Sequence, residues 1–250
     1  MKSKGVSCGS RVNPVIRHDI SRLLSANPYP GRGIILGRSE DGTRSIALYF
    51  IMGRSVNSRN RVFESTDDGI RTKAHDPEKM TDPNLVIYHP VRVFNGRTIV
   101  SNGDQTDTIR EYLISAKDFR DALMTREFEP DAPNYTPRIS GLIELDGSYS
   151  LSILKTADGS PSCCLRAFFE YSGAIAGLGH FISTYKTDGD PLPPFEGEPI
   201  PVDIAVSDGL ESYARNVWES LNDENKVSLY AREIVIATGK SADFIFNKNE

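Results

Sequence analysis

The sequence is poor in the features that mark secreted, membrane-bound and metal-binding proteins. Its 250 residues contain three cysteines, and the adjacent Cys163 and Cys164 form neither a disulfide framework nor a spaced metal motif. The longest uninterrupted apolar run, Ile46 to Met52, is far shorter than the roughly 18 residues that indicate a membrane span. No apolar stretch of signal-peptide length stands at the N-terminus. We therefore expect a reduced, soluble, cytoplasmic protein with no membrane partner.

An excess of positive charge is also missing. The chain has 29 lysines and arginines against 34 aspartates and glutamates, which gives a formal net charge of −5. Such a chain has no net electrostatic attraction to nucleic acid, so we expect no nucleic-acid partner. The four histidines, His18, His75, His89 and His180, are scattered, and none has the spacing of a metal-ligand pair. We therefore expect no metal site.

The sequence does contain a succession of strand-like segments. Runs 33–37 and 45–52 are separated by Ser-Glu-Asp-Gly-Thr, and Asn95-Gly96 joins 84–94 to 97–100; both junctions are typical of β-hairpins. Because the first two runs are apolar almost throughout, we expect both of their faces to be covered. Further strands are predicted at 138–145, 150–154, 163–171, 180–185 and about 227–236, with a proline-rich loop at 187–201 and a polar tail at the end.

Helical patterns interrupt the strands. A short helix is predicted at 106–113, and Ser115-Ala-Lys-Asp118 fits a capping box for a second helix that ends near Phe128. Apolar residues recur at helical spacing from Leu210 to Leu221, with Ser207 as the expected cap. Residues 1–30 are interpreted as an N-terminal arm with a short helix opened by Asp19. No composition break divides the chain, so we predict one α+β domain over 1–250, with stacked sheets and helices outside.

Three polar features are candidates for chemistry. Segment 53–61 carries three arginines directly after a buried strand, and guanidinium groups bind phosphate through paired hydrogen bonds, although a solvated loop has the same composition. Segment 101–109 joins a strand to a helix N-terminus, where anions bind, but a capped turn explains the same residues. Tyr88 and Glu129 are polar residues in apolar surroundings, and burial would raise the pKa of Glu129 into the range of a general acid or base. The glycines of 31–37 have the wrong spacing for a dinucleotide fingerprint and precede a strand.

Several of these segments together resemble the archaeal-type IMP cyclohydrolase family. The matching strings follow the family's order: Gly53-Arg-Ser with its Asn/Arg cluster, Val100-Ser-Asn-Gly-x-x-Thr-Asp-Thr-Ile109, Thr136-Pro-Arg-Ile139 and Ile182-Ser-Thr-Tyr185. The resemblance implies a four-layer α-β-β-α sandwich of mostly antiparallel sheets, similar to the N-terminal-nucleophile hydrolases but without self-processing. It also implies a homo-oligomer.

The resemblance further implies closure of the purine ring in a small purine ribotide. The carboxamide nitrogen of 5-formamidoimidazole-4-carboxamide ribotide would attack the formyl carbon, and water would leave to give inosine monophosphate, with no cofactor and no metal. Transferred residue by residue, the catalytic positions fall on Arg59, Tyr88 and Glu129. Arg59 would bind an anionic or carbonyl group, Tyr88 would orient or protonate the formyl oxygen, and Glu129 would take the amide proton, although the last two roles are exchangeable.

The remaining expectations concern the lining of the substrate pocket and two alternative functions. The resemblance also implies that Arg54, Asn102, Thr106 and Arg138 line the substrate pocket. One alternative is a purine-nucleotide-binding protein without turnover. The other is a Cys-dependent amidase of the same fold, in which trimming of the chain would expose Cys8.

Overall fold

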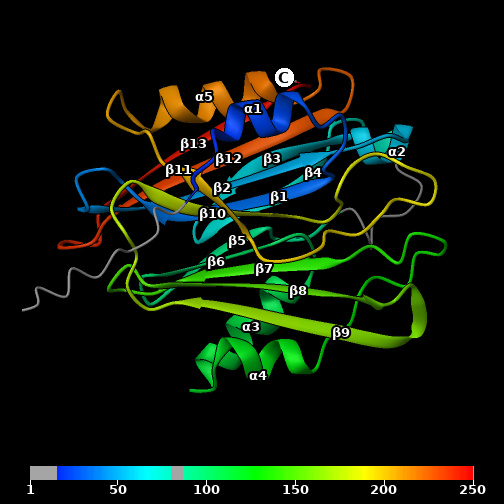
Figure 1. Cartoon of the computed structure of the whole chain (residues 1–250), viewed down its shortest axis with the longest axis horizontal. Helices are drawn as coiled ribbons and strands as arrows, with labels where there is room; N and C mark the ends of the chain where they lie inside the picture. The colour runs from blue at the N-terminus through cyan, green and yellow to red at the C-terminus, as the bar shows by residue number, and fades with distance from the viewer. Residues whose placement is uncertain (1–15, 80–86, 250) are drawn as a thin grey trace, which may run out of the picture.

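The computed structural model describes residues 16–79 and 87–249, whose strands form two antiparallel sheets (Figure 1). In spatial order, the first sheet contains β11 (Ile200–Asp203), β10 (Leu178–Ser183), β1 (Arg32–Arg38), β2 (Arg44–Met52), β12 (Lys226–Val235) and β13 (Ser241–Asn247). The second contains β3 (Arg61–Thr66), β4 (Gly69–Ala74), β5 (Val91–Phe94), β6 (Arg97–Ser101), β7 (Arg138–Ile143), β8 (Tyr149–Ala157) and β9 (Ser160–Tyr171). Every pairing between these strands is antiparallel, as predicted.

Helices cover the outer face of each sheet. Helices α1 (Ile20–Ser25) and α5 (Leu210–Ser220) pack on the first sheet, and α3 (Gln105–Ile114) and α4 (Phe119–Met124) pack on the second (Figure 1). The inner faces of the two sheets share one core. The short helix α2 (Val56–Arg59) and a 3₁₀ turn at Pro77–Lys79 lie in connections. The order of layers is therefore helix, sheet, sheet, helix, and the predicted α+β class is confirmed.

The central strands are buried on both faces. Along β1 and β2 successive side chains point to opposite sides of the sheet. Ile35 and Leu48 pack under the helices, whereas Ile34 and Tyr49 pack against the second sheet. This confirms that the continuous apolar runs mark strands covered on both sides.

Two glycines of β1 allow close packing. A Cβ added at Gly33 would lie 2.3 Å from the Phe50 ring, and one added at Gly37 would lie 2.6 Å from Cα of Gly179. The glycine spacing that superficially matches a nucleotide-binding loop therefore serves the contacts between β1 and its neighbours.

The helix boundaries correct two expectations. Asp19 caps α1 through the backbone N–H of Ser21, as predicted. The helix predicted from Ser115 to about Phe128 is present but shorter, because Ser115 is the C-cap of α3 and α4 spans Phe119–Met124. Its cap is Asp118, which accepts from the N–H of Asp121, so the predicted capping role of Ser115 is wrong. The predicted Ser207 cap of α5 is also wrong, since the N-cap residue is Gly209, without a side-chain hydrogen bond.

The predicted polar tail is wrong as well, because residues 241–247 form the edge strand β13. Its aromatic residues alternate, so that Phe244 and Phe246 pack toward α5, where Phe246 stacks on Trp218. The predicted strand 84–94 is confirmed only from Val91, and its first residues, 84–86, lie outside the described residues.

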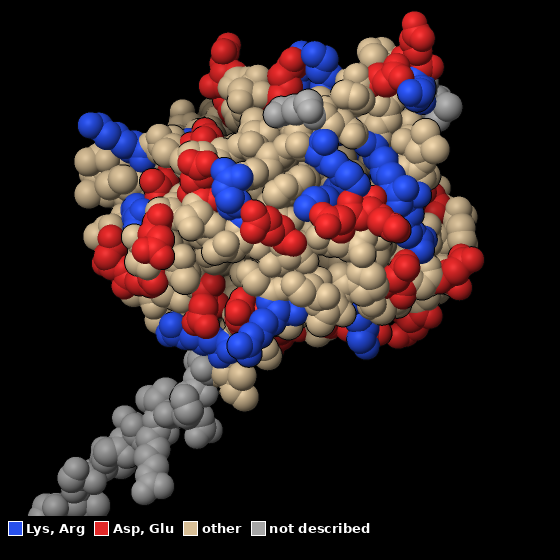
Figure 2. Space-filling model, turned by 90° about the horizontal axis from the view of Figure 1, so that it is seen from above, with Lys and Arg blue, Asp and Glu red and all other residues tan. Residues whose placement is uncertain are grey.

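The helical face of the first sheet carries both signs of charge. Figure 2, which views the molecule from the side of α1 and α5, shows lysines and arginines interspersed with aspartates and glutamates. No helix in residues 16–79 and 87–249 is both long and apolar enough to cross a bilayer.

The close contact at Gly37 gives a stability prediction. A G37A substitution would place a methyl group against the backbone of β10, and overpacking of this kind costs about 1–3 kcal/mol. We expect the melting temperature to fall by several degrees. The matched control is G173A, where an added Cβ has no atom within 4 Å. Equal melting temperatures for the two variants, measured by circular dichroism, would contradict the packing role of Gly37.

Candidate active site

Charged and phenolic side chains from both sheets meet at one end of the sandwich. Strand alternation places Arg32 on the same inward face of β1 as Ile34, and Arg61 on the same inward face of β3 as Phe63. The other members come from β2 and from loops next to strand ends. The cluster consists of Tyr29, Arg32, Tyr49, Arg61, Tyr88, Glu129 and Tyr185. We call these seven residues the arginine–tyrosine cluster.

The two arginines of this cluster have unused hydrogen-bond donors. Arg61 is 1% exposed, and its Nε donates to the backbone oxygen of Ser58 at 2.9 Å. The buried Nη2 of Arg61 and the buried Nε of Arg32 have no hydrogen-bond partner among the described residues. Neither guanidinium forms an ion pair within this part of the chain. Because buried donors are almost always satisfied, these groups indicate a site for an anion or a carbonyl oxygen.

The electrostatics of the two arginines are coupled. Burial lowers the pKa of Arg61, and the neighbouring Arg32 cation lowers it further. Burial also opposes the charge on Arg32, but the nearby acidic groups of Tyr185, Tyr29 and Glu129 raise its pKa overall, the two tyrosines only once they ionise at high pH. The cluster therefore holds positive charge that a bound anion would stabilise.

Tyr88 is fixed at its backbone and at its hydroxyl. Its N–H donates to Oγ1 of Thr72 at 2.9 Å, and its carbonyl oxygen accepts from the N–H of Thr72 at 2.9 Å. The Tyr88 hydroxyl lies 2.8 Å from the hydroxyl of Tyr49. With 6% of its surface exposed, Tyr88 is held rigidly in the wall of the cluster.

Glu129 is a buried carboxylate that faces cations. Its backbone N–H donates to the carbonyl oxygen of Thr136 at 2.9 Å, and the residue is 6% exposed. Burial raises its pKa, although Arg32 and Arg138 act in the opposite direction. A buried glutamate with a raised pKa suits proton transfer to or from a bound ligand.

Tyr185 joins the Glu129 loop to the first sheet. Its hydroxyl lies 2.7 Å from Oγ1 of Thr136, which donates to Asp131 at 2.5 Å. Burial raises the pKa of Tyr185 to about 12, so the hydroxyl stays neutral. The ring stacks with that of Tyr29, with centroids 6.0 Å apart.

Three predicted pocket residues support the turn next to Glu129. Asn102 uses Oδ1 to accept from the N–H of Ile139 at 2.8 Å and Nδ2 to donate to Pro137. The Thr106 hydroxyl is bonded to Ser101 and Gly103. Arg138 donates to Asp104 at 2.7 Å and to Gln105 at 2.6 Å.

A Cβ added at Gly103 would lie 2.5 Å from Nη1 of Arg138 and 3.5 Å from Oε1 of Glu129. Asn102, Thr106 and Arg138 thus surround the turn at Gly103, against which Glu129 lies, and their roles in substrate binding stay predictions.

Two predicted arginines lie at the surface. Arg54 donates to Asp188 at 2.6 Å, and its guanidinium lies 5.1 Å from the centre of the Tyr29 ring, at the border of the cluster. Arg59 is exposed and donates to the backbone oxygen of Gly53 and to Asn225, both at 2.9 Å. The structure therefore brings Tyr88 and Glu129 together with Arg32 and Arg61 and places Arg59 outside the cluster. The ligand role of Arg59 stays a prediction.

The members of the cluster that were not among the expected site residues are Tyr29, Arg32, Tyr49, Arg61 and Tyr185. The strand pattern of the sequence does indicate both arginines. Each is the first residue of a strand and lies two positions before an inward-facing apolar residue, so strand alternation places it on the same face. Within 16–79 and 87–249, no group of three or more His, Cys, Asp and Glu residues could hold a metal ion. Cys8, the expected nucleophile of the amidase alternative, lies outside the described residues.

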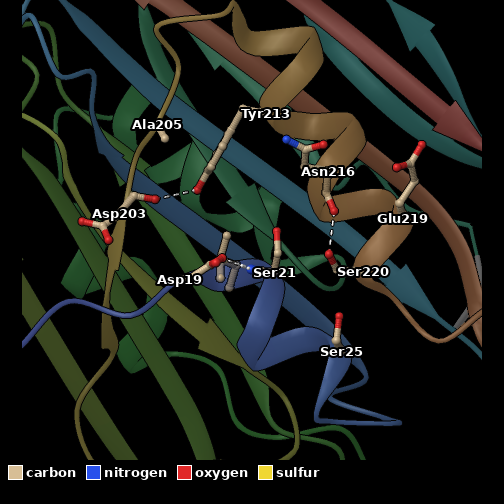
Figure 3. Close-up of a pocket in the computed structure, with 10 residues that line it drawn as sticks. Asp19, Ser21, Ser25, Asp203, Ala205, Tyr213, Asn216, Glu219 and Ser220 are labelled. Atoms are coloured by element: carbon tan, nitrogen blue, oxygen red, sulfur yellow. Dashed lines mark hydrogen bonds between the residues drawn. The ribbon is translucent and has the colours of Figure 1, made fainter.

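A cavity of about 570 Å³ lies elsewhere, between α1 and α5 (Figure 3). Its lining includes the carboxylates of Asp19, Asp203 and Glu219. Several of its polar groups already serve the local structure; for example, the Tyr213 hydroxyl donates to the backbone oxygen of Asp203. Because this lining is acidic, the cavity does not suit an anionic ligand, and the arginine–tyrosine cluster remains the candidate site.

Comparison with known proteins finds several archaeal relatives of the same description. The chain is similar to the IMP cyclohydrolase of Methanopyrus kandleri, with 34% identity over 116 residues, 45% of this chain and 57% of that protein. It is also similar to the IMP cyclohydrolases of Methanococcus aeolicus, with 26% identity over 125 residues (48% and 61%), and Methanocella arvoryzae, with 26% identity over 153 residues (57% and 74%). The first two matches span about three fifths of those relatives.

A family model described as IMP cyclohydrolase-like protein matches residues 29–240. That range contains every member of the arginine–tyrosine cluster. The chain therefore belongs to the IMP cyclohydrolase-like protein family.

Proposed function

We propose that this protein is an IMP cyclohydrolase whose active site is the arginine–tyrosine cluster. The observation that carries the proposal is a pair of guanidinium groups beside Tyr88 and Glu129, each with one buried N–H that has no partner among the described residues. Such a site suits a substrate with several carbonyl oxygens and a phosphate. The family membership supports 5-formamidoimidazole-4-carboxamide ribotide as that substrate.

The first step forms the ring. Both reacting groups are on one imidazole, so the enzyme mainly holds the formyl group in the reactive rotamer. As the amide nitrogen attacks the formyl carbon, one amide proton passes to Glu129. The Tyr88 hydroxyl protonates the formyl oxygen, and the guanidinium groups of Arg32 and Arg61 stabilise negative charge on the substrate oxygens.

The second step expels water. The protonated Glu129 returns its proton to the new hydroxyl group, which leaves as water. The former formamido nitrogen loses its proton to the Tyr88 oxygen, and the new C=N bond completes the purine. Both side chains thus return to their starting states without a redox step or a phosphoryl transfer.

Two broader features belong to the same proposal. The helix, sheet, sheet, helix order of layers supports an N-terminal-nucleophile-hydrolase-like fold, used here without a nucleophilic terminal residue. The resemblance of the sequence to the family supports one domain that assembles into a homo-oligomer in the cytoplasm. Light scattering on the purified chain tests the assembly.

The roles of Tyr88 and Glu129 are tested by ring closure itself. Purified protein and the formamido ribotide are mixed, and ultraviolet absorbance follows formation of the purine. We expect turnover by the unchanged chain and a loss of at least about 100-fold in kcat for E129Q, as is typical for removal of a general base. Binding of inosine monophosphate without turnover by the unchanged chain would instead indicate a nucleotide-binding protein.

The raised pKa of Glu129 has a consequence for stability. Because burial raises this pKa, ionisation of Glu129 destabilises the folded chain at pH values above its folded pKa. E129Q removes that cost, so its melting temperature at neutral pH should equal or exceed that of the unchanged protein. The difference should vanish below the ordinary pKa range of glutamate, where the carboxyl is protonated in both states. A melting temperature of E129Q that is lower at pH 7 would argue for a structural role of the carboxylate.

The same shift predicts the acid limb of the activity profile. Glu129 acts as a base only when ionised, so kcat/KM should fall as the pH drops through its raised pKa. The midpoint should lie above the ordinary range for glutamate. An acid limb at or below that ordinary range would assign the base to another group.

Arg59 and Arg61 make different predictions for ligand binding. A charge-assisted hydrogen bond contributes about 1.5–3 kcal/mol, so R61K should reduce kcat/KM by roughly 10-fold to 150-fold. We expect R59K to have a smaller effect, because Arg59 is exposed and bonded to Gly53 and Asn225. The reverse order of effects would return the ligand role to Arg59.

A further inference from the structure

Tyr49 is a buried tyrosine whose packing does not require a hydroxyl group. It lies in the middle of β2, opposite Ile34 on one side and Tyr230 on the other, and none of its surface is exposed. Its ring stacks on Phe63 of the second sheet, with centroids 5.7 Å apart. A phenylalanine would make the same apolar contacts, so the hydroxyl needs a separate explanation.

The hydroxyl of Tyr49 is directed at Tyr88. The two hydroxyl oxygens are 2.8 Å apart, and among the described residues Tyr88 is the hydrogen-bond partner recorded for this group. Burial and the adjacent Tyr88 raise the pKa of Tyr49 well above its usual range, which keeps the hydroxyl protonated. Tyr49 is therefore a neutral donor at the pH of the cell.

By distance alone either hydroxyl of this pair could donate, and the surroundings favour Tyr49 as the donor. Arg32 and Arg61 are the charged groups that act on Tyr49, and guanidinium groups have only N–H donors. The proton of Tyr49 thus has the oxygen of Tyr88 as its acceptor. The proton of Tyr88 is then free to point toward a bound ligand.

We infer that Tyr49 is a positioning residue that holds the Tyr88 hydroxyl with its proton directed into the active site. The inference rests on the proposed function, in which Tyr88 protonates the formyl oxygen. Negative charge develops on the Tyr88 oxygen as its proton leaves, and the hydrogen bond from Tyr49 strengthens at that moment. Tyr49 therefore acts mainly on the transition state, which affects kcat more than KM.

The test compares Y49F with a matched control. Y149F also removes a buried tyrosine hydroxyl between the sheets, which is 2.7 Å from Nδ1 of His180 and outside the cluster. We expect Y49F to lower kcat about tenfold, the upper end for one neutral hydrogen bond, with KM within about twofold. We expect Y149F to leave both constants within about twofold. Equal losses for the two variants would overturn the inference.

A double-mutant cycle separates positioning from general destabilisation. If Tyr49 acts through Tyr88, Y49F should have little further effect on the residual turnover of Y88F. Additive losses in the double variant would refute the inference, even if each single variant is impaired.

A spectroscopic measurement keeps this test distinct from the proposed function. With tyrosine labelled at the ζ carbon, the Tyr88 resonance should move in Y49F and stay in place in Y149F. The Tyr49 resonance should likewise move in Y88F, where position 49 is unchanged. If neither the Tyr88 resonance in Y49F nor the Tyr49 resonance in Y88F moves, the inferred interaction between the two hydroxyl groups is contradicted. Absence of turnover by the unchanged chain, with the resonance shifts present, would refute the proposed function alone.

Discussion

The candidate site depends on two guanidinium groups, one fully buried (Arg61) and one half-buried (Arg32), that lie between facing β-sheets. Burial of a cation is unfavourable, and two neighbouring cations repel each other, which is why the pKa of Arg61 is lowered. Tyrosine hydroxyls and the carboxylate of Glu129 surround the pair and offset part of that cost. The remaining positive potential and unpaired donors are the property that a ligand with carbonyl and phosphate oxygens would use.

The sandwich provides the rigidity that this arrangement needs. Arg32 and Arg61 lie at the starts of strands from different sheets, so their separation is set by the packing of one sheet on the other. Tyr88 is held through its backbone by Thr72 and through its hydroxyl by Tyr49. The proposed chemistry requires little beyond such fixed positions, because the reacting groups of the substrate are already adjacent.

The loops at this end of the sandwich are fastened in a similar way. The proline-rich segment is bonded to Arg54 through Asp188 and to Asn134 through the N–H of Leu192. Leu192 and Phe195 of this segment are buried, so a loop that is polar in composition still contributes to the core. Stability and site geometry therefore share the same contacts at this end of the molecule.

Local sequence signals were sufficient for most of the secondary structure. The Asn95-Gly96 turn, the runs that became β1 and β2, and the amphipathic α5 follow from rules that involve neighbouring residues only. The errors also have local causes. Ser115 and Asp118 are both good caps, and only the turn after α3 decides between them. β13 begins with polar residues, a pattern that predicts a polar tail. The motif resemblance placed Tyr88 and Glu129, which the structure brings to one cluster.

The sequence by itself determined the α+β class, the antiparallel strands and the chemical types of the site residues. Only the tertiary structure decided which arginines face the candidate site. Arg59 and Arg61 are two residues apart and identical in chemistry, yet α2 ends at Arg59 and β3 begins at Arg61. The first side chain consequently lies in solvent and the second between the sheets. The contact made by Tyr49 could also be identified only from the tertiary structure, because its hydrogen-bond partner Tyr88 is 39 residues away in sequence and lies on the opposite wall of the core.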